Sequence, residues 1–142
     1  MLILDANILV RAVLGKRVRG ILEAYFGRIR FLVADAAIDE AREHVPRMLG
    51  SRGLDPHLAS AVLEELVKWL EVVEADTYAA CEADARRRLA GRDIEDWPTA
   101  AAALTFGCDV WTEDTDFFGA GIATWTTDRV EILLESLASK GE

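Results

Sequence analysis

The stretch Asp93-Ile-Glu-Asp96-Trp-Pro-Thr-Ala-Ala-Ala-Ala-Leu104 begins with acidic residues and continues as a run of small apolar side chains. Pro98 is tolerated only in the first turn of a helix, so the pattern predicts a helix that begins near Asp96 and packs its alanines closely on a sheet. A short apolar run then predicts a strand over residues 109–112, and Trp111-Thr-Glu-Asp-Thr-Asp-Phe117 places more acids directly after it. Acidic residues therefore stand at the start of a helix and again just past a strand.

Outward from this stretch, the chain alternates between apolar strand-like runs and amphipathic helical segments. Strands are predicted over residues 1–4, 30–34, 71–74, 109–112 and 122–126. Helices are predicted over residues 7–14, 20–26, 35–50, 58–70, 76–89, 96–107 and 128–138, with Asp35, Asp55 and Asp76 as caps and residues 140–142 fraying. The alternation favours an α/β fold, with a parallel sheet, helices on both faces and right-handed crossovers. The length fits one domain over residues 1–142 with a single core.

Charge is unevenly distributed along the chain, whose formal net charge is −9. Residues 1–92 hold 14 basic and 14 acidic side chains, whereas residues 93–142 hold 2 basic and 11 acidic ones. An acidic chain does not resemble a general nucleic-acid binder, but carboxylates gathered in one site repel one another unless a divalent cation neutralises them. A solvated acidic surface in the C-terminal part is the ordinary alternative.

The sequence also excludes several classes of protein. It shows no apolar run that could span a membrane and no signal peptide, so a cytoplasmic protein without a membrane partner is expected. Cys81 and Cys108 form no CxxC motif, and His44 and His57 form no zinc-type cluster with them. Neither a structural disulfide nor a zinc site is therefore expected.

In a parallel sheet, functional groups gather at the carboxyl ends of the strands, next to the point where the strand order reverses. One acid ends the first predicted strand and two follow the fourth, so these acids meet if the two strands are neighbours. Another lies one or two turns into the helix after the second strand, and two more stand at the start of the helix before the fourth. The acids expected at this edge are Asp5, Glu40, Asp93, Asp96, Asp114 and Asp116.

Several acids at one edge without a matching Lys or Arg are costly, and a hard cation relieves that repulsion. Carboxylate oxygens and waters suit Mg²⁺ or Mn²⁺, whereas the lack of a His/Cys cluster argues against zinc. Such a metal activates a water and stabilises charge on a phosphate. The pattern therefore points to metal-assisted phosphodiester hydrolysis.

Each acid also fits an ordinary structural role when it is taken alone. Asp5 and Asp96 suit helix caps, and the acids after the fourth strand suit turns, where Asp is common. Glu40 suits a solvated helix residue, with Asp39 and Glu43 as competitors for its role. It is the placement of these acids at strand and helix ends that favours a site.

At these residues the chain resembles PIN-domain nucleases. The family pattern of an acid in an apolar strand followed by a small residue and Asn matches Leu4-Asp-Ala-Asn7, and its helical Glu after the second strand matches Glu40. Its acid at the head of an alanine-rich helix matches Asp96, and its Thr-x-Asp-x-Asp-Phe element matches Thr112-Glu-Asp-Thr-Asp-Phe117. The resemblance implies a three-layer α/β/α PIN-like fold with a five-stranded parallel sheet. It also implies Mg²⁺ or Mn²⁺ at the acids and cleavage of RNA.

The resemblance assigns roles to the matching residues. The catalytic acids that hold the metal are Asp5, Glu40, Asp96 and Asp114. Asp116 supports a second ion, or the first through water. The supporting residues are Asn7 and Thr112, which orient ligands, and Asp93 beside the helix start.

Compact PIN domains of this length are often VapC-type ribonuclease toxins, which form homodimers and are silenced by a cognate antitoxin protein. The sequence hypothesis is therefore an Mg²⁺- or Mn²⁺-dependent endoribonuclease that acts as the toxin of a toxin–antitoxin pair, with DNA cleavage left open. Arg11, Lys16, Arg17 and Arg19 are candidates for holding the RNA backbone, or else form a solvated helix end. Trp97, next to Asp96, is the one tryptophan to be tested for base stacking, because the others suit the core or groove walls.

Two other classes of function stay open. One is a non-catalytic PIN-fold module that binds RNA or protein. The other is phosphoryl transfer through an aspartyl-phosphate, since an Asp at a strand end also marks phosphatases and response receivers. Against it, Asn7 stands where the phosphatase pattern has a second Asp, and no Lys follows the later strands before Lys140.

Overall fold

The structure is a computed structural model that describes residues 1–140. Within these residues the sheet holds five parallel strands in the order β3-β2-β1-β4-β5. The strands are β1 (Leu2–Leu4), β2 (Phe31–Ala34), β3 (Glu71–Val73), β4 (Asp109–Trp111) and β5 (Thr124–Trp125). The order reverses at β1, which pairs with β2 on one side and with β4 on the other. The predicted α/β fold with a five-stranded parallel sheet is confirmed.

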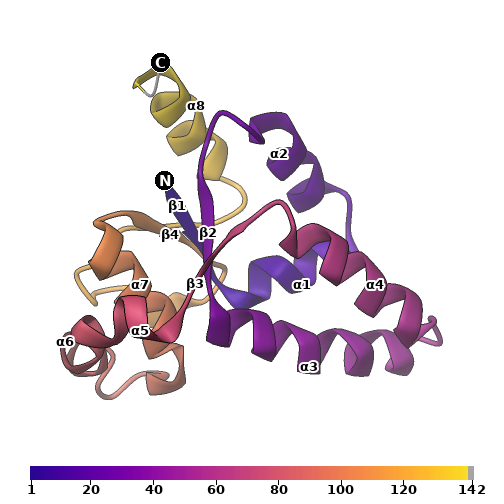
Figure 1. Ribbon diagram of the computed structural model, residues 1–142, viewed down its shortest axis with the longest axis horizontal. Helices are drawn as coiled ribbons and strands as arrows, with labels where there is room; N and C mark the ends of the chain where they lie inside the picture. The colour runs from indigo at the N-terminus through magenta and orange to yellow at the C-terminus, as the bar shows by residue number, and fades with distance from the viewer. Residues whose placement is uncertain (141–142) are drawn as a thin grey trace.

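Helices cover both faces of the sheet, which makes three layers (Figure 1). Helix α7 contacts β1, β2 and β4 and lies with α5 and α6 on one side, whereas α1 and α2 lie on the other. The helices are α1 (Ala6–Leu14), α2 (Arg17–Tyr25), α3 (Asp35–Ser51), α4 (Pro56–Val67), α5 (Ala75–Tyr78), α6 (Glu82–Arg88), α7 (Trp97–Phe106) and α8 (Val130–Lys140). Three short 3-10 helices are also described: η1 (Ala79–Cys81), η2 (Ile94–Asp96) and η3 (Thr115–Phe117).

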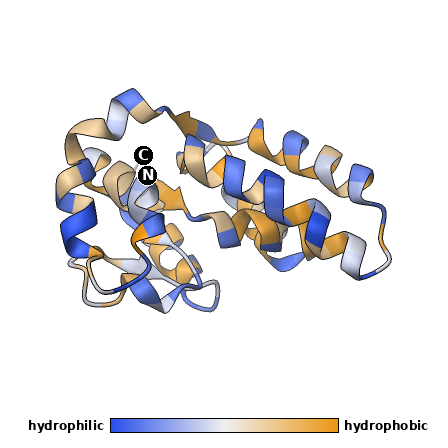
Figure 2. Ribbon diagram, turned by 90° about the horizontal axis from the view of Figure 1, so that it is seen from below, coloured by the Kyte–Doolittle hydropathy of each residue, from blue (hydrophilic) through white to orange (hydrophobic). Residues whose placement is uncertain are grey.

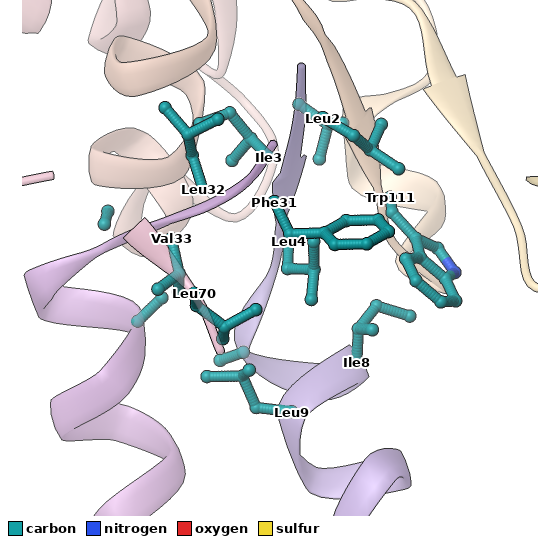
Figure 3. Close-up of a cluster of buried hydrophobic side chains, with 14 of the residues drawn as sticks. Leu2, Ile3, Leu4, Ile8, Leu9, Phe31, Leu32, Val33, Leu70 and Trp111 are labelled. Atoms are coloured by element: carbon teal, nitrogen blue, oxygen red, sulfur yellow. The ribbon is translucent and has the colours of Figure 1, made fainter. Parts of the chain in front are cut away.

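The core forms where β1 is covered by α1, because every residue of β1 is apolar and fully buried. Figure 3 shows the Phe31 ring of β2 reaching past Leu4 toward the Trp111 indole of β4, with Ile8 and Leu9 of α1 below them. Full burial of one such side chain contributes about 1.5–3 kcal/mol. This packing fixes the end of β1, and therefore Asp5, relative to β4.

Helix α7 lies close to the sheet because its contact face is made of alanines. Residues 100–103 are all alanine, and each is at most 2% exposed. Small side chains let the helix backbone approach the strands, so the first turn of α7 is held at the edge of the sheet where β1 and β4 end. This confirms the packing predicted from the alanine run.

Helices α3 and α4 pack on each other and form an arm that reaches beyond the sheet. Figure 2 shows both helices striped with hydrophobic and hydrophilic residues, as expected for helices with one face packed and one in water. Among the described helices, none combines the length and the apolarity that crossing a membrane requires.

Two of the three predicted helix caps are wrong. Asp55 does cap α4, but Asp35 is the first residue of α3, and its carboxylate accepts hydrogen bonds from the Ala75 amide (3.0 Å) and the Tyr78 hydroxyl (2.6 Å). Asp76 lies inside the first turn of α5, and the single helix predicted over residues 76–89 is divided into α5, η1 and α6. Lys140 is the last residue of α8, and the predicted fraying of residues 141–142 lies outside the described residues.

Candidate active site

The pairing of β1 with β4 brings Asp5 and Thr112 together. The Asp5 side chain, 3% exposed, caps α1 by accepting from the Ala6 amide at 2.8 Å. Its second oxygen accepts from the Thr112 hydroxyl at 2.8 Å and from the Asn7 side-chain amide at 3.1 Å. Asp5 therefore caps α1, as predicted, but its second oxygen is held by Asn7 of α1 and by Thr112 at the end of β4.

Asn7 and Thr112 also fix the segment that carries the later acids. The Thr112 hydroxyl accepts from the Asp114 amide at 2.9 Å, and the Asn7 side-chain oxygen accepts from the Glu113 amide at 3.1 Å. Removing either side chain would take one hydrogen bond from Asp5 and one from the 113–114 backbone. Both side chains thus hold Asp5 and the 113–114 segment in place, and their role in orienting metal ligands stays a prediction.

Asp5, Glu40 and Asp96 form the first carboxylate group, with one oxygen from each lying within 4.8 Å of the others. Glu40 reaches it from α3 and is exposed, whereas Asp96 stands at the N-cap position of α7. Asp96 makes no capping hydrogen bond, and its buried Oδ2 atom has no hydrogen-bond partner among residues 1–140. This carboxylate is directed into the site instead of being used by its own helix.

Asp93, Asp114 and Asp116 form a second group, again with oxygens within 4.8 Å of one another. Asp93 caps η2 through the Glu95 amide (3.2 Å), and Asp114 caps η3 through the Asp116 amide (2.9 Å). The predicted acids thus gather at one edge but in two adjoining groups. Asp114 is placed with Asp93 and Asp116, and Asp93 and Asp96 do not share a group.

The carboxyl groups perturb one another, as their pKa values show. Burial, reinforced by Glu40 and Asp114, raises the pKa of Asp5 from 3.8 to about 6, although the Thr112 hydrogen bond opposes this. Burial first, and then the negative charge of Asp5, raise the pKa of Asp96 well above its ordinary value. The pKa of Glu40 is also raised, chiefly by burial, with His44 opposing the shift. Each shift records a site that disfavours additional negative charge.

These residues fit a hard divalent cation. The possible ligands in both groups are carboxylate oxygens, and the groups of this kind found within residues 1–140 contain neither His nor Cys. The orphaned Oδ2 of Asp96 supplies a buried acceptor that a cation would satisfy. Oxygen donors of this type suit Mg²⁺, Mn²⁺ or Ca²⁺ and not zinc.

A sequence model of one family, described as PIN domain, matches residues 3–135. The chain belongs to the PIN domain family. No curated protein matches the chain significantly.

Several solved structures share the fold of this PIN domain. FitAcB from Neisseria gonorrhoeae is 22% identical with a TM-score of 0.64, and the match covers 89% of this chain and 98% of that one. VapBC2 from Rickettsia felis, bound to a promoter DNA fragment, is 15% identical with a TM-score of 0.70, over 88% and 97% of the two chains. DNA-bound VapBC from Salmonella typhimurium is 21% identical with a TM-score of 0.68, over 89% and 97%. At these identities the likeness shows the fold.

Two clefts of the PIN domain open at Glu40. One, of about 540 Å³, is lined by Asp5, Glu40 and Asp96 together with Trp97 and Tyr78. The other, of about 490 Å³, runs between α1 and α3 from Asn7 and Glu40 to Arg11 and Arg52, with Val10, Leu14 and Met48 as apolar lining. A ligand at the carboxylates therefore has two directions in which to extend.

The basic residues suggested by the sequence have different surroundings. Arg19 donates to the backbone carbonyls of Ala12 (3.1 Å) and Val13 (3.2 Å) near the end of α1, so its role is structural. Arg17 forms an exposed ion pair with Asp128 (3.3 Å), and Arg11 lies at the cleft.

Sequence reasoning missed Arg52, Tyr78 and Arg86 of this PIN domain. Tyr78 lines the first cleft, and the Arg86 guanidinium lies over the Trp97 ring. The positions of Tyr78 and Arg86 follow from the break between α5 and α6, which the apolar period of the sequence does not reveal, whereas Arg52 follows the end of α3. The one sequence feature that could have pointed to these residues was Trp97, which directly follows the predicted catalytic acid Asp96.

Proposed function

We propose that this PIN domain is a divalent-metal-dependent endoribonuclease that hydrolyses RNA phosphodiester bonds with Mg²⁺ or Mn²⁺. The observation that carries the proposal is the convergence of two adjoining carboxylate groups at the end of β1 and β4, one of which contains a buried oxygen without a partner among residues 1–140. Acids from four separate segments that meet in this way repel one another when they are ionised, and a bound cation would neutralise that repulsion.

The residues would act in distinct ways. Asp5, Glu40 and Asp96 would hold a first ion, while Asp114 and Asp116 would hold a second or bind the first through water. The bound cation supplies charge neutralisation for the phosphate and activation of water. Asn7 and Thr112 would keep Asp5 in one orientation through their hydrogen bonds. Carboxylate oxygens that are left free, including those of Asp93, would accept the proton that the attacking water loses.

The substrate would reach the acids along the cleft between α1 and α3. Arg11 and Arg52 line this cleft and have no carboxylate partner within salt-bridge distance among residues 1–140. Guanidinium groups of this kind bind phosphates, which are repelled by the acids themselves. The two arginines are therefore the best candidates for the backbone contacts.

The biological setting proposed is that of a VapC-type toxin. The similar structures from Neisseria gonorrhoeae, Rickettsia felis and Salmonella typhimurium are named as FitAcB or VapBC, and one from Klebsiella pneumoniae is described as a toxin-antitoxin complex. By that analogy, the chain would form a homodimer in the cytoplasm and bind a cognate antitoxin protein. The non-catalytic module predicted as the alternative would keep the fold without the metal.

The decisive experiment is RNA cleavage with and without Mg²⁺ or Mn²⁺ by the wild type, Asp5→Asn and Asp96→Asn. Loss of one metal ligand is expected to lower kcat/KM at least about 100-fold, since a metal stabilises the transition state by several kcal/mol. Glu64→Gln is the matched control, because Glu64 is exposed, pairs with Arg42 at 2.9 Å and lies on α4 outside the lining of both clefts. Undiminished cleavage by either Asp variant would reject the assignment. An inactive wild type that binds no Mn²⁺ by calorimetry would favour the non-catalytic module.

A further inference from the structure

Trp97 is an aromatic side chain that shares a cleft with the carboxylates. It directly follows Asp96, is half-buried and lines the same cleft as Asp5 and Glu40. Its ring therefore stands beside the place where a scissile phosphate would lie. Nothing in the proposed hydrolysis uses it.

The indole is held in one orientation by its neighbours. The Arg86 guanidinium carbon lies 4.7 Å from the ring centroid, and the Tyr78 ring meets it edge-on at 5.6 Å and 67°. These supports are fixed in turn: Arg86 donates to the Glu82 carboxylate at 2.7 Å, and the Tyr78 hydroxyl donates to Asp35 at 2.6 Å. A ring that is oriented beforehand loses little entropy when a ligand stacks on it.

The other tryptophans make structural contacts and do not line the cleft of the carboxylates. Trp111 is fully buried and donates to Thr127, and Trp125 donates to Asp109. Trp69 packs against Phe26, with ring centroids 5.0 Å apart. The Trp97 indole nitrogen donates no hydrogen bond within residues 1–140, so it is free for a ligand.

The walls around Trp97 favour a flat, uncharged ligand with N–H donors. Asp39, Glu43 and Glu95 line this cleft beside the site carboxylates, and the arginine behind the indole is paired with an acid. A phosphate would be repelled from such walls, whereas a nucleobase carries no charge and several bases present amino groups to carboxylates. Aromatic side chains stack unpaired bases with little dependence on sequence.

We propose that Trp97, supported by Arg86 and Tyr78, is the stacking platform for an unpaired nucleobase next to the scissile phosphate. The proposal rests on the proposed function and deepens it, because it restricts the substrate to RNA that is single-stranded at the cut. One unpaired base flanking the cut stacks on the indole, while the backbone stays at the carboxylates and along the cleft between α1 and α3.

The test is an abasic scan of a cleaved RNA oligonucleotide, in which each base near the cut is removed in turn. For the wild type, one abasic position is expected to lower kcat/KM roughly tenfold to a hundredfold, the worth of one stacked base. Trp97→Leu should cleave the intact RNA more slowly by a similar factor and show no further loss at that position. Trp97→Phe should recover part of the loss. Trp69→Leu, which removes an indole on another surface, should keep the wild-type abasic penalty.

A penalty of the same size in Trp97→Leu would overturn the proposal, because the indole would then act only through packing. Binding of the same RNAs in Ca²⁺, measured by fluorescence anisotropy, gives a readout that does not depend on cleavage. If removal of one base weakens RNA binding to the wild type but not to Trp97→Leu, the platform is supported. If the wild type then cuts no RNA, only the proposed nuclease function is rejected. Cleavage with no position-specific penalty, or no RNA binding at all, overturns the platform.

Discussion

Replacing Asp96 by Asn is expected to make the metal-free protein more stable while it removes a metal-binding group. Asp96 is half-buried, its Oδ2 atom has no partner within residues 1–140, and the Asp5 and Asp114 carboxyls lie beside it. Ionisation of Asp96 in the folded state is therefore unfavourable, because the charge is partly buried and lies next to other negative charges. Asn keeps the shape of the side chain and has no charge to bury.

The sign and size of the effect follow from the pKa values. The carboxyl of Asp5, raised from 3.8 to about 6, shows what this site does to an acid: the difference corresponds to about 3 kcal/mol. Asp96 is driven further in the same direction, to a pKa of about 9, so its substitution should add at least about 3 kcal/mol to the free energy of unfolding at pH 8. A carboxyl with a raised folded pKa stabilises the protein below its unfolded pKa near 4, and this contribution is lost as the pH rises through the folded pKa. The advantage of Asp96→Asn should therefore grow from pH 4 upward.

The assay is thermal unfolding in EDTA between pH 4 and pH 8. A gain of about 3 kcal/mol corresponds to roughly 10 °C in Tm for a chain of this length. The control is Glu135→Gln, an exposed carboxylate of α8, which should change the stability by less than about 0.5 kcal/mol. Excess Mn²⁺ should stabilise the wild type and have a much smaller effect on Asp96→Asn. A variant that melts at or below the wild-type temperature in EDTA at pH 8 would refute the reasoning.

Three further predictions concern other parts of the molecule. Thr112→Val removes the hydroxyl that donates to Asp5 at 2.8 Å, so it should lower the free energy of unfolding in urea by about 1–3 kcal/mol and weaken Mn²⁺ binding in calorimetry. Unchanged Mn²⁺ affinity would show that Thr112 does not support the metal site. Arg52→Ala should weaken RNA binding for all sequences and reduce the slope of log affinity against log salt by about 0.7, and an unchanged slope would place the backbone elsewhere. Gly121 has a φ of +78°, and Gly121→Ala would place a Cβ 2.5 Å from the Arg88 guanidinium, so it should lower the free energy of unfolding by about 1–3 kcal/mol. An unaltered urea midpoint would show that the loop and Arg88 move to accommodate the methyl group.

The sequence predicts the parts of this site that depend on strand ends and small residues. Asp5 and Thr112 follow short apolar runs, and parallel strands bring their carboxyl ends to one edge, so their meeting needs only the adjacency of β1 and β4. The alanines of α7 show in the same way that this helix lies close to the sheet. Asp96, at the start of this helix, accordingly lies with Asp5 and Glu40, and its role as a metal ligand stays a prediction.

The division of the acids into two groups lies beyond sequence reasoning. Asp93 and Asp96 are three residues apart and would share one face of a regular helix, but η2 ends before Pro98 and sends them to different groups. The contacts that hold the Trp97 ring could not be predicted from the sequence either. It depends on Asp35 holding Tyr78 across a long sequence separation, whereas the local pattern favours a helix cap for that carboxylate.

The hydrogen bond between Asp5 and Thr112 joins residues 107 positions apart, at the beginning and near the end of the chain. A growing polypeptide that has emerged only as far as β3 has neither the strand nor the acids that complete the pocket. During synthesis the carboxylate site thus stays incomplete until β4 has left the ribosome and paired with β1. Under the proposed function, a truncated or prematurely released product would therefore cleave no RNA.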